Sequence, residues 1–200
     1  MRTLHFVFVF SALLAGLFLT VSTQSAYAQW GVGVSFELRD ENPEDGFGLR
    51  VERRVFQQLP VVQFNMRAHF SYFRDTETIS FFTPGDPLQT DTELETFDFG
   101  LGLTGGIPIG LIFPYVGLGL GLDDTSFDAD MVFRDDAGNA LSPEPFSQTD
   151  FYWNLFVGGE ISVLPFLKPF IEYRFTDIAN RGDVTPDTVN RVSIGVNVRF

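Results

Sequence analysis

Apolar residues alternate with small or polar residues along most of this chain, and this period of two limits its fold more than any other feature. In the first such segment the apolar positions are Trp30, Val32, Val34, Phe36 and Leu38. A period of two gives a β-strand two distinct faces, whereas a helix needs apolar residues three and four positions apart. The pattern recurs eight times and predicts strands at residues 30–39, 47–52, 62–72, 97–104, 115–122, 151–161, 170–175 and 191–200.

The connections between these segments alternate between short and long. The short ones are residues 57–60, 105–111 and 164–165, and the long ones are 40–46, 74–93, 123–150 and 176–188. With the N-terminus on the side of the short turns, every short turn lies at one end and every long loop at the other. This asymmetry, together with strands of about ten residues, is typical of transmembrane β-barrels.

The composition of the two strand faces indicates which face points outward. One face is bulky and apolar throughout, and the other combines glycine with Arg, Glu, Asn and Asp. Because the interior of an eight-stranded barrel is only wide enough for side chains, apolar residues from every strand would overfill it. Inward glycines would instead leave room for long arginines. The predicted fold is therefore all-β: an eight-stranded antiparallel transmembrane β-barrel, built as an up-and-down meander, with its apolar face toward lipid.

Aromatic residues on the apolar face predict two girdles, one at each membrane interface. Those toward the long loops are Phe36, Phe47, Phe70, Tyr72, Phe97, Phe151, Trp153 and Phe175; those toward the short turns are Trp30, Phe64 and Phe200.

Arg53 is a charged residue that also has outward parity. Placing its side chain in lipid at mid-bilayer would cost roughly 2–4 kcal/mol. We expect it to snorkel at the short-turn interface, unless a bulge turns it inward.

The first 28 residues read as a secretory signal peptide that is removed. Arg2 supplies the positive charge, residues 6–21 are almost entirely apolar, and Ala26-Tyr27-Ala28 forms the cleavage signature. The predicted domain organisation is therefore a signal peptide at 1–28 and a barrel domain at 29–200. We expect export across the inner membrane.

The charge and the cysteine content exclude several classes of function. The formal net charge is −13, from 26 acidic and 13 basic residues, so no nucleic-acid partner is expected. The chain has no cysteine, which excludes disulfides, thiolate metal sites and a cysteine nucleophile. Most acids fall in the long connections, where solvation is favoured over weak divalent-cation capture because no twelve-residue calcium loop is present. No cofactor and no metal site are predicted.

Charged residues with inward parity form the candidate functional site. The predicted lumen charge network comprises Glu37, Arg39, Arg50, Glu52, Arg67, Asp98, Glu172, Arg174 and Arg191, and the further inward charges are Arg54, Glu160 and Arg199. If the first hairpin turns about residues 40–46, Glu37 lies roughly opposite Arg50. The network could be a gate for ions or a plug of paired charges. Near-balance of signs in a narrow lumen favours the plug.

Two β-prone runs lie within the connection 74–93. Residues 78–82 and 88–96 flank a Pro-Gly-Asp-Pro turn at 84–87, a pattern that predicts a hairpin. Such a hairpin would continue the ladder of the third and fourth strands beyond the bilayer. Its open edge would be a template for strand addition by a partner.

The chain resembles the small outer-membrane β-barrel family of the OmpA and OmpX type. The resemblance rests on PYVGLGLG at 114–121, on KPFIEYRF at 168–175, and on a terminal strand that ends in Phe200. It implies a bacterial outer-membrane location, contact with outer-membrane lipids, and a surface partner for the extracellular loops. It also implies that the barrel-assembly machinery reads the last strand, with Phe200 as the assembly signal.

The function expected from this resemblance is structural, with surface interaction, in the cell envelope. The alternative is a narrow, porin-like channel for ions or small solutes. A lipid A-modifying enzyme is a distant third alternative. It arises because lipid A deacylases of the outer membrane use a His-x-Ser pair that His69 and Ser71 resemble. Two residues of strand span almost 7 Å, which is long for a nucleophile and its base, even with Asp98 nearby. We therefore predict no catalytic residues and no enzyme activity.

Overall fold

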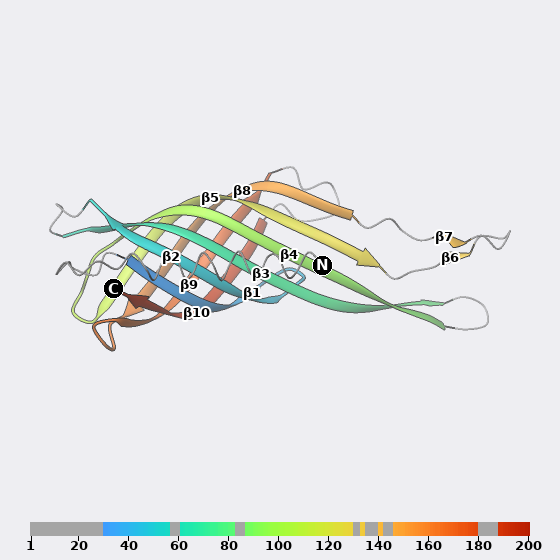
Figure 1. The fold of residues 1–200 in the computed structure, drawn as a ribbon, viewed down its shortest axis with the longest axis horizontal. Coiled ribbons are helices and arrows are strands. Elements are labelled where there is room, and N and C mark those ends of the chain that lie inside the picture. The colour runs from blue at the N-terminus through green and yellow to red at the C-terminus, as the bar shows by residue number, and fades with distance from the viewer. Residues whose placement is uncertain are drawn as a thin grey trace.

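The barrel is closed and antiparallel, as Figure 1 shows. The computed structural model describes residues 30–56, 61–82, 87–129, 133–134, 140–141, 146–179 and 188–200, so the predicted signal peptide lies outside it. The barrel strands are β1 (Trp30–Arg39), β2 (Asp45–Val55), β3 (Gln63–Phe82), β4 (Pro87–Gly106), β5 (Ile112–Ala129), β8 (Phe146–Ile161), β9 (Leu167–Ile178) and β10 (Thr188–Arg199). A separate two-stranded sheet contains β6 (Phe133–Arg134) and β7 (Ala140–Leu141). No helix among the described residues is long and apolar enough to cross a membrane.

The first and last strands close the barrel. The strand order is β1-β10-β9-β8-β5-β4-β3-β2, so each strand pairs with its barrel neighbours along the chain and β10 pairs with β1. At the seam, the backbone nitrogen of Trp30 donates to the Phe200 carbonyl at 3.0 Å, and the Phe200 nitrogen donates back at 2.9 Å. The predicted eight-stranded antiparallel meander is confirmed.

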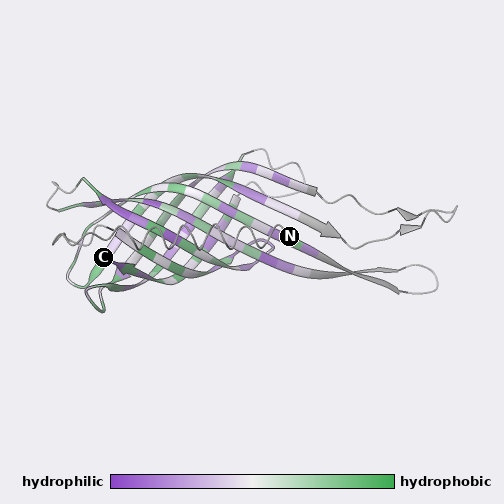
Figure 2. Ribbon diagram, viewed as in Figure 1, coloured by the Kyte–Doolittle hydropathy of each residue, from purple (hydrophilic) through white to green (hydrophobic). Residues whose placement is uncertain are grey.

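The two strand faces point as predicted. On β5, Val116, Leu118 and Leu120 are exposed on the outer surface, whereas the alternating residues Tyr115 and Gly117 are buried inside. Figure 2 shows hydrophobic positions recurring along the strands of the barrel wall. The outer surface therefore suits lipid, and the polar face lines the lumen.

Inward glycines make room for rings as well as for arginines. A Cβ atom at Gly117 would lie 2.3 Å from the Phe156 ring, and one at Gly121 would lie 2.3 Å from the Tyr152 ring. Both rings fill the lumen from β8, the strand beside β5. The absence of a side chain at Gly117 and Gly121 therefore lets this narrow interior hold the two aromatic rings.

Half of the barrel wall is taller than the other half. The neighbouring strands β3, β4, β5 and β8 have 16–20 residues, whereas β1, β2, β9 and β10 have 10–12. In Figure 1 the long strands extend together past the rest of the barrel. Their outward residues change from apolar to polar along the way, from Tyr72 and Phe97 to Arg74 and Glu95. This change marks the lipid boundary at the long-loop end.

The projecting strands correct one prediction and confirm another. The connection at 123–150 was expected to be a loop, but β5 continues to Ala129 and β8 begins at Phe146. The expectation failed because polar residues occupy both faces above the boundary, where alternation no longer marks a strand. The hairpin expected after residue 74 is confirmed, since β3 and β4 stay paired as far as Phe82 and Pro87.

Arg53 lies where the sequence placed it, at the short-turn end. It pairs in register with Trp30, its side chain is exposed, and its Cζ lies 5.1 Å from the centre of the Trp30 ring. A guanidinium over an indole at this level combines a polar head with an interfacial ring, as expected of a snorkelling side chain.

The packing around Gly117 can be tested by substitution. Gly117→Val would drive a side chain into the Phe156 ring and the Leu103 carbonyl, so we expect a loss of about 1–3 kcal/mol of folding stability. Gly159→Val is the matched control, because nothing lies within 4 Å of a Cβ atom there. The measurement is the fraction that migrates as the compact species on an unheated detergent gel. Equal fractions for both variants would contradict tight packing of the lumen.

Candidate functional site

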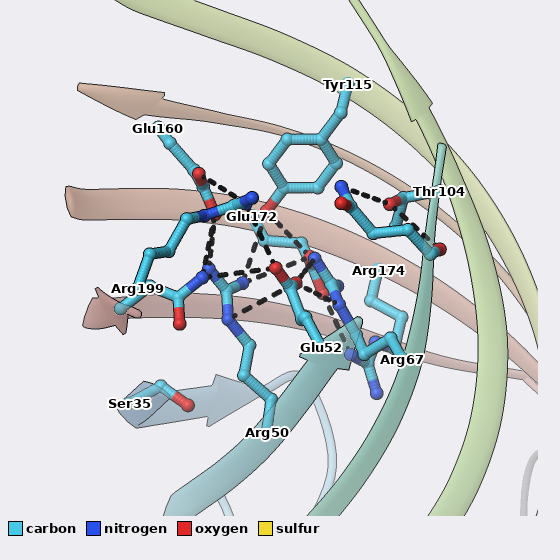
Figure 3. Close-up of polar contacts among 12 residues, drawn as sticks. Ser35, Arg50, Glu52, Arg67, Thr104, Tyr115, Glu160, Glu172, Arg174 and Arg199 are labelled. Atoms are coloured by element: carbon cyan, nitrogen blue, oxygen red, sulfur yellow. Dashed lines mark hydrogen bonds and ion pairs between the residues drawn. The ribbon is translucent and has the colours of Figure 1, made fainter. Parts of the chain in front are cut away.

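The charged side chains of the lumen form two clusters, one above the other along the barrel axis. The short-turn cluster comprises Arg50, Glu52, Arg67, Tyr115, Glu160, Glu172, Arg174 and Arg199 (Figure 3). The long-loop cluster comprises Glu37, His69, Ser71, Asp98, Tyr152 and Arg191. All of these side chains are buried.

Glu172 is a carboxylate of the short-turn cluster with several buried partners. It forms ion pairs with Arg67 and, at 2.8 Å, with Arg174, and it accepts a hydrogen bond of 2.8 Å from the Tyr115 hydroxyl. These partners come from β3, β9 and β5, on different sides of the barrel. Glu172 therefore cross-links the wall through the lumen.

The other two carboxylates of this cluster are also shared between arginines. Glu52 pairs with Arg67 at 2.7 Å and with Arg199 at 3.1 Å. Glu160 pairs with Arg50 at 3.1 Å and with Arg199 at 2.8 Å. Because a buried ion is costly unless several partners surround it, this sharing is what makes the charges tolerable inside the barrel.

Aromatic rings cover the arginines of the short-turn cluster. The Cζ of Arg50 lies 3.3 Å from the centre of the Phe170 ring. The Cζ of Arg67 lies 4.8 Å from the Phe156 ring and 5.2 Å from the Tyr115 ring. These rings exclude water from the ion pairs while offering each cation a favourable electrostatic surface.

Arg191 organises the long-loop cluster. Its guanidinium pairs with Asp98 at 2.6 Å and with Glu37 at 3.1 Å, and it donates to the Ser71 hydroxyl at 3.1 Å. These contacts join β10 to β4, β1 and β3. The lumen is thus cross-linked at a second level by a single cation.

Arg39 lies beyond this cluster, toward the long loops. Its Nε donates to the Pro43 carbonyl at 2.8 Å, and its Nη2 donates to the Thr96 hydroxyl at 3.3 Å. The centre of the Phe73 ring lies 4.2 Å from the Cζ of Arg39 and 4.7 Å from that of Arg191. The ring therefore offers both guanidinium groups a favourable electrostatic contact.

The structure gives His69 and Ser71 different partners. His69 Nε2 lies 2.9 Å from the Tyr152 hydroxyl and 3.2 Å from Asp98 Oδ1, and the Tyr152 hydroxyl donates to Asp98. Ser71 instead accepts its hydrogen bond from Arg191. Serine, histidine and aspartate, the three residue types of a hydrolase triad, are all present. The Ser71 hydroxyl, however, accepts a hydrogen bond from Arg191 in the lumen and none from His69 is seen among the described contacts.

The nine residues predicted for the lumen network all have their side chains buried inside the barrel. The one specific pairing predicted among them, Glu37 opposite Arg50, is wrong. Glu37 lies across from Gly46, and Arg50 lies across from Gly33, because the first hairpin closes within residues 40–44. Glu37 pairs instead with Arg191 of β10.

The nine predicted residues leave out six members of the two clusters: Tyr115, Glu160, Arg199, His69, Ser71 and Tyr152. Glu160 and Arg199 had been recognised as inward charges, yet each holds two partners in the short-turn cluster. Tyr115 and Tyr152 were missed, although both contribute hydroxyl groups to carboxylates. Both tyrosines have inward parity, which could have identified them, but a tyrosine ring also reads as an apolar residue.

No group of three or more potential metal ligands occurs in the described part of the chain.

The stabilising role of the shared carboxylates can be measured with one substitution at two sites. Glu172→Gln removes the carboxylate on which Arg174 depends, so we expect a loss of roughly 3–5 kcal/mol in unfolding free energy. Glu93→Gln is the matched control, because the Arg74–Glu93 pair is largely exposed and solvated. Urea unfolding in lipid vesicles gives the comparison. A Glu172→Gln variant as stable as the control would show that the buried network contributes little.

Comparisons with known proteins support the architecture. The family model described as "Outer membrane protein beta-barrel domain" matches residues 11–200. No curated protein matches the chain in sequence.

Solved structures with the same fold are distant in sequence. Neisserial surface protein A is 17% identical with a TM-score of 0.52, covering 86% of this chain and 96% of its own. A major outer membrane protein from Thermus thermophilus is 12% identical with a TM-score of 0.54, covering 86% and 99%. OprG from Pseudomonas aeruginosa is 11% identical with a TM-score of 0.51, covering 90% and 99%. The chain therefore belongs to the outer membrane protein β-barrel family and is a protein of the bacterial outer membrane.

Proposed function

We propose that this protein is a non-enzymatic barrel of the cell envelope that presents the β3–β4 hairpin as an interaction surface outside the cell. The observation that carries the proposal is the continuation of the β3–β4 ladder beyond the lipid boundary, from Phe73–Thr96 to Phe82–Pro87. At about 3.3 Å per residue and a strand tilt of about 40°, these pairs rise roughly 25 Å above the membrane.

The projecting part of β3 has one edge without a neighbour in the described structure. Pairing between β2 and β3 ends at Gly46 and Phe73, and among the described strands only β4 accompanies β3 farther. The backbone N–H and C=O groups along that edge can accept an extended segment of another protein as an added strand. Such a partner would be recognised mainly through main-chain hydrogen bonds.

The filled lumen supports a structural role over the porin-like alternative. Glu172 and Arg191 each bind side chains from several strands, and the surrounding charges are buried against aromatic rings. An ion that crossed the barrel would have to break pairs at both levels. Those pairs are costly to separate where water is excluded.

Conductance distinguishes these two functions. We expect the purified protein in planar lipid bilayers to show no stable conducting state at neutral pH, because both clusters block the lumen. A boiled sample and a porin of known conductance are the controls. Steady single-channel currents from the folded protein would favour the channel.

The interaction surface can be removed without disturbing the barrel. Residues 78–91 are replaced by Asn-Gly, which forms a tight turn between the directly paired Glu77 and Thr92. In a second variant, a flexible Gly/Ser loop of the original length replaces the same residues. It keeps the length of the connection but removes the β3–β4 backbone pairing. We expect cells that display either variant to adhere less to protein-coated surfaces, with the folded amount in the outer membrane unchanged. Full adhesion by both variants would rule out the hairpin as the binding surface.

A further inference from the structure

The short turns of this barrel carry large apolar side chains on their surface. In the β4–β5 turn, Ile109 and Leu111 are 63% and 69% exposed, and in the β8–β9 turn Phe166 is 53% exposed. We call the exposed apolar residues of the three short turns the apolar rim: Phe56, Val61, Ile107, Ile109, Leu111, Val163, Leu164 and Phe166. Exposed apolar surface of this extent marks a contact with something other than water.

Backbone hydrogen bonds hold the rim in place. The turn nitrogen of Ser162 donates to the Leu111 carbonyl at 2.8 Å, which ties the β8–β9 turn to the β4–β5 turn. The Phe166 carbonyl accepts from the Arg199 nitrogen of β10 at 2.9 Å. These bonds fix the β4–β5 and β8–β9 turns to the barrel end.

The rim is continuous with the lipid-facing surface. Ile112 and Ile161 are the outermost paired residues of β5 and β8 at this end, and both are exposed on the outer face. Leu111 and Val163 lie one and two residues beyond them, which places the rim only about 3–7 Å past the lipid-facing band. The stretches 107–114 and 161–167 contain no charged residue.

The β2–β3 turn carries apolar side chains at the same end of the barrel. Phe56 packs edge-on against Phe64 of the short-turn girdle, with ring centres 6.0 Å apart. Its φ of 51° lies in the left-handed region, which a phenylalanine adopts at a cost of roughly 1–2 kcal/mol. The strained backbone thus holds a large ring at the outer edge of the girdle.

We infer that the apolar rim is embedded in the periplasmic leaflet of the outer membrane, with phospholipid as its partner. Short turns of such barrels face the periplasm, and the rim extends the surface that already contacts lipid there. A second copy of the chain does not fit, because two rims that point toward the periplasm from one membrane cannot meet face to face.

The absence of cysteine from the chain allows a direct depth measurement. Single cysteines at Leu111, Phe166 and Phe56 are spin-labelled in vesicles of phosphatidylethanolamine and phosphatidylglycerol. Leu118→Cys in the middle of the band and Thr149→Cys above the long-loop boundary are the controls. We expect the rim labels to be accessible to oxygen and at least threefold less accessible to a water-soluble nickel complex than the Thr149 label.

Two outcomes would overturn the inference. Rim labels as accessible to nickel as the Thr149 label, both in vesicles and in isolated outer membranes, would place the rim in water. Labels open to nickel in vesicles but protected in outer membranes would show that a periplasmic protein covers the rim. A triple variant, Ile109→Ser with Leu111→Ser and Phe166→Ser, gives a second readout. We expect its folding yield to be highest in vesicles of shorter acyl chains than those preferred by the unmodified protein, and an unchanged preference would contradict lipid contact.

Discussion

Closure of the backbone hydrogen-bond ladder is the constraint on which the rest of this structure depends. Lipid offers no partner to a free N–H or C=O group, so a sheet can cross it only as a closed barrel. Pairing of β1 with β10, sealed by the mutual hydrogen bonds of Trp30 and Phe200, meets that requirement with eight strands. Eight strands leave a narrow interior, which in turn requires inward glycines wherever a ring or a guanidinium extends across it.

The contents of that interior follow from the same geometry. A lumen too narrow for bulk water cannot hold an isolated charge, and each short-turn carboxylate accordingly contacts two or more cations. Some of these partners are far apart in the chain: Arg67 and Glu172 are separated by 105 residues, and Arg191 and Glu37 by 154. These long-range ion pairs can form only when the strands are nearly closed. They stabilise the closed barrel, whereas the Arg67–Glu52 pair lies within the β2–β3 hairpin.

The sequence predicted the parts of this fold that depend on parity and missed those that depend on register. Alternation alone identified eight strands, their outward face and the inward charges. The pairing of Glu37 failed because a hairpin register depends on where the turn closes. Its partner is Gly46 and not Arg50, and a shift by an even number of residues leaves the alternation unchanged. The extensions of β5 and β8 were missed because both of their faces meet water. Tyr115 and Tyr152 were missed for a different reason. The sequence does not reveal whether a tyrosine contributes an apolar ring to packing or a hydroxyl group to a hydrogen bond.

The outward-facing residues change from apolar to polar in different ways at the two ends of the barrel. At the long-loop end the outward residues turn polar within one step of the girdle, as Tyr72 gives way to Arg74 and Leu122 to Asp124, while the strands continue. At the short-turn end the strands stop, but the apolar surface continues through Ile109, Leu111 and Phe166. A polar wall can project into water at no cost, whereas an apolar turn is favourable only near lipid. The apolar outer surface is therefore not centred along the barrel axis: it extends to the short turns at one end and stops well before the ends of the long strands at the other.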